Sequence, residues 1–127
     1  MKKNHLDNLE HALNRLTEFQ KLPVITDRDK AGIIQAFEFS FELLWKALQE
    51  RAEEEGANVA SPKKAFQYAL KSGFIKPTEE KEWVKVLEDR NLCSHTYDEE
   101  LADAVYERIT KFHTRALLEL FSKIKKN

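Results

Sequence analysis

The sequence predicts an all-α protein, a bundle of about five helices, two of them long, that forms a homodimer. Apolar residues recur at three- and four-residue spacing along most of the 127 positions, which is the spacing of one face of an α-helix. Only three glycines and three prolines are present, too few for the many tight turns of an all-β fold. The length fits one domain, which we expect to span residues 1–127.

Charge and cysteine content limit the classes of function. Charged residues make up 34% of the chain, and the formal net charge is -1, so no overall positive field attracts nucleic acid and any RNA contact has to be local. The single cysteine, Cys93, excludes an intramolecular disulfide, and we interpret it as a small apolar filler. No window approaches the roughly 18 apolar residues of a membrane span. We therefore expect a cytoplasmic protein without membrane contact.

Two long amphipathic segments come first in the chain. Residues 6–22 carry leucines at helical spacing, and Pro23 ends this predicted helix. The second helix is predicted over residues 27–55. Thr26 is its expected N-cap, and two aspartates in the first turn favour the positive end of the helix dipole.

The middle of this second helix is apolar on nearly every side. Its apolar residues mark one face with Ile33, Phe37, Leu44 and Leu48, a second face with Ile34, Phe41 and Trp45, and positions off both faces with Phe39 and Leu43. A helix that is apolar all round is buried on more than one side. In a domain this small, we expect one of those sides to meet a second subunit. The alternative is a central helix that its own chain surrounds.

The next two helices are shorter. Ser61 as N-cap and Pro62 at the first helical position predict a helix over residues 62–71. Thr78 is the expected N-cap of a fourth helix, with two glutamates in its first turn. This fourth helix is predicted to end near Cys93.

The fifth helix has the clearest start. Thr96 followed by Glu99 forms the pattern of a capping box, so the helix is predicted to begin near Tyr97. Apolar residues at helical spacing over 105–124, with Phe112 among the inward positions, predict one continuous helix to the lysine-rich C-terminus.

The stretch DRNLCSHTYDEE, residues 89–100, gathers unusual polar chemistry between the fourth and fifth helices. On one continuous helix, Arg90 and His95 would lie about 140° apart around the axis. Because the predicted capping box breaks the helix between them, we expect a corner where the two side chains are neighbours. The sequence thus predicts a site at this junction.

The residue types at this corner are those that RNA cleavage without a metal requires. Arg90 offers a planar cation suited to phosphate, and His95 transfers protons near neutral pH. The 2′-hydroxyl of the RNA would be the nucleophile, and the cation would stabilise the charged phosphorane. Asn91 and Tyr97 would position the phosphate or stack on a base.

Simpler interpretations of the same residues stay open. His95 is then a surface or capping group, Arg90 pairs with a nearby carboxylate, and Tyr97 is half-buried core. Glu38 and Glu42, one turn apart on the second helix, are interpreted as ion-pair partners or as lining a dimer cleft, rather than as catalytic carboxylates. The four histidines show no paired ligand spacing, so we expect no metal site and no cofactor.

Beyond single residues, the sequence resembles the HEPN superfamily. Arg90, His95 and Tyr97 match its R-x4-H-x-Y motif. Three longer segments, QAFEFSFELLWKAL, SPKKAFQYALKSGFI and W…RNLCSHTYDEELA, are similar to the branch called nucleotidyltransferase substrate-binding proteins, which is close to the HepT toxins. The resemblance covers nearly the whole chain in order.

The resemblance implies an up-and-down helical bundle that forms homodimers, and a partner encoded next door, a minimal nucleotidyltransferase (MNT). In HepT-like members the motif is the active site of a metal-independent ribonuclease, and two copies face each other across the dimer. The partner acts as antitoxin and can transfer AMP to the motif tyrosine, here Tyr97. A nucleotide phosphate there would place negative charge and bulk beside Arg90 and block the site.

Three hypotheses follow for the function. In the first, the protein is an endoribonuclease toxin in which Arg90 holds the phosphate, His95 is acid or base, and Asn91 and Tyr97 position the substrate. In the second, it is a non-catalytic subunit that binds a nucleotide or phosphate at the same corner for the nucleotidyltransferase. In the third, it is only a structural helical dimer.

Overall fold

The computed structural model describes residues 3–126, and over that range every regular element is a helix, as predicted. The α-helices are α1 (Lys3–Lys21), α2 (Asp27–Glu54), α3 (Pro62–Lys71), α4 (Glu80–Leu92), α5 (Glu99–Arg108) and α6 (Thr114–Lys126). Three short turns join some of them: the 3-10 turns η1 (Pro77–Glu79) and η2 (Cys93–His95), and the π turn η3 (Ile109–His113).

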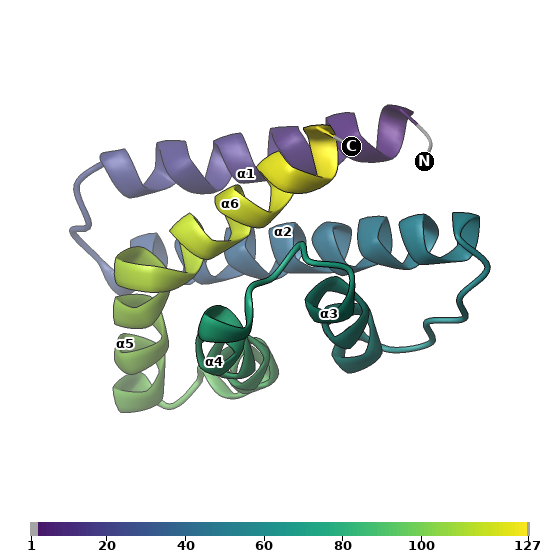
Figure 1. Ribbon diagram of the computed structural model, residues 1–127. Coiled ribbons are helices and arrows are strands. Elements are labelled where there is room, and N and C mark those ends of the chain that lie inside the picture. Colours follow the sequence, from purple (N-terminus) through teal and green to yellow (C-terminus); the bar gives the residue numbers. More distant parts are fainter. Residues whose placement is uncertain (1–2, 127) are drawn as a thin grey trace.

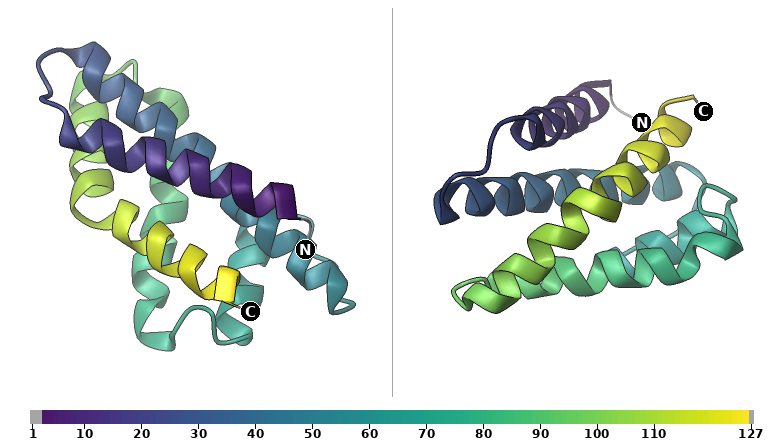
Figure 2. Two further views of the ribbon diagram at one scale, coloured as in Figure 1. Left: turned by 90° about the horizontal axis from the view of Figure 1, so that it is seen from above. Right: turned by 90° about the vertical axis from the view of Figure 1, so that its left-hand side faces the viewer.

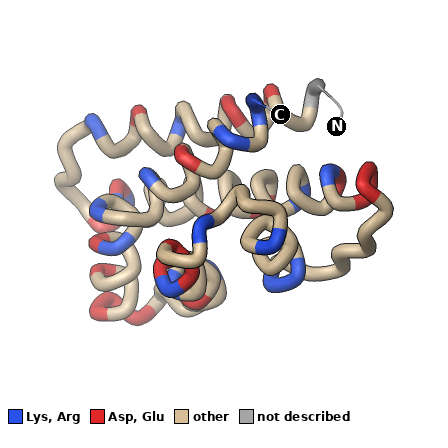
Figure 3. Tube along the Cα trace, viewed as in Figure 1, with Lys and Arg blue, Asp and Glu red and all other residues tan. Residues whose placement is uncertain are grey.

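Helix α2 is the centre of the bundle. It packs against α1, α3, α5 and α6. Figures 1 and 2 show α1 running antiparallel beside α2, with α3 and α4 on the opposite side of α2 from α1. Helix α6 crosses back to contact both α1 and α2. Acidic and basic residues are interspersed along the helices (Figure 3), as expected for solvated helix faces.

The central position of α2 changes the argument for a dimer. The chain itself buries Ile33, Phe37, Phe41 and Leu44, each of which is at most 2% exposed, and it half-buries Trp45. The alternative of a helix surrounded by its own chain therefore describes these residues correctly. They give no reason to expect a second subunit on that surface.

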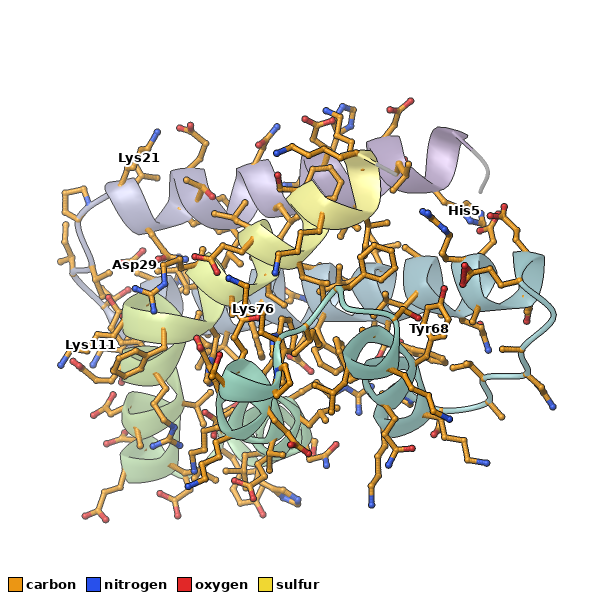
Figure 4. The ribbon with its side chains drawn as sticks, in the orientation of Figure 1. His5, Lys21, Asp29, Tyr68, Lys76 and Lys111 are labelled. Atoms are coloured by element: carbon orange, nitrogen blue, oxygen red, sulfur yellow. The ribbon has the colours of Figure 1, made fainter. Side chains whose placement is uncertain are left out.

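The predicted starts of α2 and α3 are confirmed. The carboxylate of Asp29 accepts hydrogen bonds from the backbone N–H groups of Ile25 at 2.8 Å and Thr26 at 2.9 Å, and these bonds lower its pKa. Figure 4 shows Asp29 beside the loop that leads into α2. The Ser61 hydroxyl accepts from the backbone N–H of Lys64 at 3.2 Å, which caps α3.

The predicted cap of α4 is wrong. Thr78 lies inside the turn η1, and α4 begins after it. Glu79 provides the local bond instead, because its carboxylate accepts from the backbone N–H of Lys76 at 2.8 Å. The proline at position 77 starts the 3-10 turn one residue before the expected cap.

The predicted cap of α5 is also wrong. The hydroxyl of Thr96 donates to the carbonyl of Cys93 at 3.1 Å, and the cap is Asp98, whose carboxylate accepts from the backbone N–H of Leu101 at 3.2 Å. The turn η2 continues the helical path of α4 through His95. The start of α5 is therefore two residues later than predicted.

The continuous fifth helix that the sequence predicts is divided by the π turn η3. A π turn accommodates one extra residue, which rotates the inward face by one position. His113 is therefore buried at 1% exposure, whereas Phe112, predicted to face inward, is 48% exposed. Figure 1 shows the chain changing direction between α5 and α6.

A buried ionic cluster fastens α4 to the α5–η3 segment. The Asp89 side chain has no solvent exposure and accepts two bonds from Arg108, at 2.7 Å from Nε and 2.9 Å from Nη2. Nε2 of His113 lies 2.7 Å from the same carboxylate, and the His113 ring stacks on Phe37 at 5.7 Å between centroids. The two-bond geometry offsets part of the desolvation cost of burying the charges.

Burial and bonding shift the acid–base equilibria of this cluster. Burial alone would raise the pKa of Asp89, but the bonds from Arg108 and His113 outweigh it and lower the pKa. Burial lowers the pKa of His113 despite the adjacent carboxylate. Neutral His113 keeps its proton on Nε2 to donate to Asp89, and Nδ1 is then buried without a hydrogen-bond partner among residues 3–126.

These shifts predict a loss of stability in mild acid. Both groups have a lower pKa in the folded state than in the unfolded state. Their contribution to the free energy of unfolding is therefore complete above the ordinary pKa, and it is lost as the pH falls through the folded-state pKa. The His113 contribution should begin to decline below pH 6.5, and that of Asp89 below pH 3.8. Urea unfolding between about pH 5 and pH 8 measures the first decline.

In the His113→Gln variant, the free energy of unfolding should no longer decline below neutral pH as it does in the wild-type protein. His11, one of two exposed histidines on α1, provides the control, since His11→Gln should retain the wild-type slope. An unchanged pH dependence in His113→Gln would contradict the assignment.

Candidate functional site

The structure places the four predicted site residues around the end of α4. Arg90 and Asn91 lie in the last turns of α4, His95 lies in η2, and Tyr97 lies in the turn before α5. The predicted break in the helix after Cys93 is present, although a 3-10 turn makes it. The chain therefore turns between α4 and α5 where a corner was expected, and that Arg90 and His95 are neighbours there stays a prediction.

The side chain of Arg90 is held against α2. One terminal amino group, Nη2, forms an ion pair with the Glu42 carboxylate, and the guanidinium carbon lies 5.8 Å from the centre of the Phe41 ring. The indole N–H of Trp45 donates to the other oxygen of Glu42 at 3.1 Å. The prediction that Glu42 pairs with a basic residue is confirmed.

Part of the Arg90 guanidinium stays available to a ligand. Its side chain is 36% exposed, and neither Nε nor Nη1 hydrogen-bonds to another residue in the described part of the chain. Guanidinium N–H groups suit a phosphate because they can donate two parallel bonds. Glu42 and Phe41 thus orient a cation that can still bind an anion.

His95 and Tyr97 form a second pair. Nδ1 of His95 lies 3.3 Å from the Tyr97 hydroxyl, and the rings meet edge to face at 5.9 Å between centroids. Tyr97 is 84% exposed, so its interpretation as half-buried core is wrong. If the hydroxyl donates to Nδ1, neutral His95 carries its proton on Nε2, which then donates a hydrogen bond; with the proton on Nδ1, Nε2 is a free base, and the ring acts as an acid only when both nitrogens are protonated.

Arg90 and His95 bond to different partners. Within residues 3–126, no hydrogen bond, ion pair or ring contact joins their two side chains. The fold brings Arg90 to Glu42 and His95 to Tyr97, at the end of one helix and in the turn that follows it. That the two functional groups act on one substrate stays a prediction.

Burial shifts the pKa values of two groups that interact electrostatically with Arg90. Burial raises the pKa of the Glu38 carboxyl, Arg90 opposes this shift, and the carboxylate of Glu42 adds to it. Burial, together with Glu38, raises the pKa of the Cys93 thiol to about 12. A thiol of that kind is not a nucleophile at neutral pH, in agreement with the interpretation of Cys93 as a filler.

Sequence reasoning missed two parts of the site. The hydrogen bond from Trp45 to Glu42 could have been suspected from the sequence, since a tryptophan three positions after a glutamate lies on the same side of a helix. The cluster of Asp89 with Arg108 has no local signal, because the residues are 19 positions apart. This cluster anchors the residue directly before Arg90 and so determines which way α4 presents Arg90.

Metal ions and membranes are the last two candidate contacts. Among the described side chains, no group of three or more histidine, cysteine, aspartate or glutamate residues is placed to hold a metal ion. Within residues 3–126, no helix has the length and apolar character needed to cross a membrane.

Comparisons with known proteins agree with the motif and the fold. Residues 4–126 match the family described as "Nucleotidyltransferase substrate binding protein like". A Haemophilus influenzae protein named "Probable ribonuclease HepT" is 35% identical over 94 residues, which are 70% of this chain and 63% of that protein. A Thermus thermophilus protein of known crystal structure is 33% identical, with a TM-score of 0.82 over 91% of this chain and 98% of that one.

The family match extends over nearly all of the sequence, and the HepT relative supports the branch that the motif indicated. The chain therefore belongs to the nucleotidyltransferase substrate-binding protein-like family, in its HepT-like branch.

Proposed function

We propose that the protein is a metal-independent endoribonuclease, the toxin of a two-gene module whose antitoxin is an MNT-type nucleotidyltransferase. The observation that carries the proposal is the oriented and partly free guanidinium of Arg90 at the end of α4, followed in the next turn of the chain by the exposed His95–Tyr97 pair. The HepT relative, named as a probable ribonuclease, supports the same activity. We place the reaction in the cytoplasm, where RNA and such a partner meet.

The proposed reaction is transfer within the RNA. His95 removes the proton of a 2′-hydroxyl, whose oxygen attacks the adjacent phosphorus and displaces the 5′-oxygen of the next nucleotide. Arg90 neutralises the added charge on the phosphorane, and Asn91 and Tyr97 position the strand. The products are a 2′,3′-cyclic phosphate and a 5′-hydroxyl, with a proton returned to the leaving oxygen.

This chemistry gives a reason for a dimer. One group has to accept the proton of the nucleophile while another donates to the leaving oxygen, and each corner has one histidine, His95. A second copy facing the first would provide the other. We therefore propose a homodimer whose two corners form one composite site.

The exposed apolar surface of α2 indicates where the copies would meet. Phe39 is 55% exposed, and it lines a hollow of about 320 Å³ between α1 and α2 together with Leu43 and Glu42. Contact over this hollow would bring Glu42, and with it Arg90, to the interface. This surface replaces the buried residues of α2 that the sequence had indicated.

The second candidate is a non-catalytic subunit that binds a nucleotide or phosphate at this corner. The family description favours it, since it names substrate binding and no cleavage. Under either function, the 84% exposure of Tyr97 leaves its hydroxyl accessible to a nucleotidyltransferase, as AMP transfer requires.

Removing either catalytic group should stop cleavage. His95→Ala should lower the rate about 10²–10⁴-fold, the usual contribution of general acid–base catalysis. Arg90→Lys should also be severely impaired, because an ammonium lacks the planar fork. The assay is cleavage of diverse RNAs with EDTA present, with product ends identified by mass spectrometry. Wild-type protein that leaves all RNAs intact, or an unimpaired His95→Ala variant, would favour the binding subunit.

The Glu42→Gln variant should distinguish the orientation of Arg90 from its affinity for the RNA phosphate. The neutral amide no longer anchors Arg90, so kcat should fall roughly tenfold through lost alignment. KM should not rise, since removal of the carboxylate also removes repulsion of the phosphate. Glu53→Gln, at an exposed position near the end of α2, is the matched control. An unchanged kcat in Glu42→Gln would show that Glu42 does not orient Arg90.

Sedimentation at micromolar concentration should show a dimer for wild type and a monomer for Phe39→Glu, because a charge in a desolvated interface costs several kcal/mol. Phe112→Glu changes a phenylalanine of similar exposure on η3 and should leave the dimer intact. A monomeric wild-type protein would refute the dimer, and a dimeric Phe39→Glu would refute its location.

A further inference from the structure

A groove of about 430 Å³ lies between α3 and α4, outside the corner described above. Its walls are mostly apolar: Phe66, Leu70, Ile75, Trp83, Val84 and Leu87. Phe66 and Trp83 are at most 5% exposed and stack on each other at 4.8 Å, so they form the floor, whereas Val84 is 49% exposed at the rim. The volume and apolar character are those of a small-molecule pocket.

The floor of the groove is linked to the Arg90 site through packed rings. The guanidinium of Arg90 lies over Phe41, and the Phe41 ring lies 5.4 Å from that of Phe66, the floor of the groove. Along α4, the groove residues Leu87 and Asn91 are one turn apart, and Arg90 lies on the adjacent flank of that turn. A ligand held at Arg90 therefore has the end of the groove beside it.

Polar side chains at the rim are suited to a neutral, flat ligand. The amides of Gln67 and Asn91 each donate and accept hydrogen bonds, as the edges of nucleobases do. The charged rim residues Lys63, Glu80 and Glu88 sum to -1 (+1 and -2), so the groove does not attract phosphates. Phosphate binding is left to Arg90, and the groove suits a base.

We propose that this groove is a nucleoside subsite, which receives the base and ribose of the nucleotide adjoining the phosphate at Arg90. The inference rests on the proposed function in one respect, since it requires a nucleotide chain at Arg90. It adds a substrate contact outside the motif: the base packs against the apolar floor, and Asn91 contacts the strand between the base and the phosphate.

The test has two parts: a substitution that fills the groove, and RNA probes that lack a base. The probe is a fluorescein-labelled RNA pentamer, bound to the His95→Ala protein so that it stays intact. Val84→Trp places a large ring in the groove from an exposed position and should weaken binding about tenfold, within the range for one stacked base. Lys81→Trp, at an exposed position of α4 outside the groove, should bind the pentamer like the parent.

Pentamers with one abasic residue complete the experiment. At one position along the strand, loss of the base should weaken binding to the parent protein. The same loss should not weaken binding further in the Val84→Trp variant, because the abasic residue and the tryptophan both remove the contact between the base and the groove. Circular dichroism confirms that each variant is folded.

The outcomes separate this inference from the ribonuclease proposal. If the wild-type protein cleaves RNA but the Val84→Trp variant binds the pentamer normally, the subsite is refuted and the nuclease stands. If that variant also fails to bind the partner protein, the groove is assigned to protein docking. If nothing is cleaved but binding depends on Val84 as described, the subsite stands and the nuclease fails. If the protein binds no RNA, both are refuted.

Discussion

The position of the candidate site depends on a carboxylate that has no contact with water. Asp89 is bound by Arg108 through two hydrogen bonds and by His113 through a third, so three segments of the chain are fixed to one another. Removing one partner of such a cluster leaves an uncompensated buried charge and costs about 3–5 kcal/mol. Because Asp89 points into the bundle, Arg90, the next residue, is turned by about 100° toward α2. The buried charge thus orients the exposed one.

A second layer of bonds refines that orientation. Trp45 holds Glu42, and Glu42 holds one amino group of Arg90 above the Phe41 ring. A long side chain loses considerable conformational entropy when it is immobilised. Because these contacts already immobilise Arg90 in the free protein, less of that entropy is lost when a ligand binds. The same aromatic contacts continue from Phe41 to Phe66 and into the groove between α3 and α4. One row of rings therefore supports both the cation and the neighbouring groove.

The sequence alone identified most of the helices and the residues of the motif. Amphipathic spacing located α1 to α4 closely, and Thr26 and Ser61 were recognised as caps because capping depends on neighbouring residues. Local patterns failed where two signals competed. Thr96 matched a capping box, but Asp98 takes that role because the helical path of α4 continues through η2. The π turn was also missed, since helical periodicity assumes a constant rotation per residue.

What only the tertiary structure decided is which side chains meet. The sequence showed Arg90, His95 and Tyr97 in a motif, but not that Glu42 pairs with Arg90 across 48 positions. It showed α2 to be apolar all round, yet could not tell intramolecular burial from a subunit interface, because both remove the same surface from water. Residue types and local spacing determine the helices and the chemistry available. Long-range packing decides which groups are buried, paired or left free, because contacts distant in sequence form only when the helices assemble.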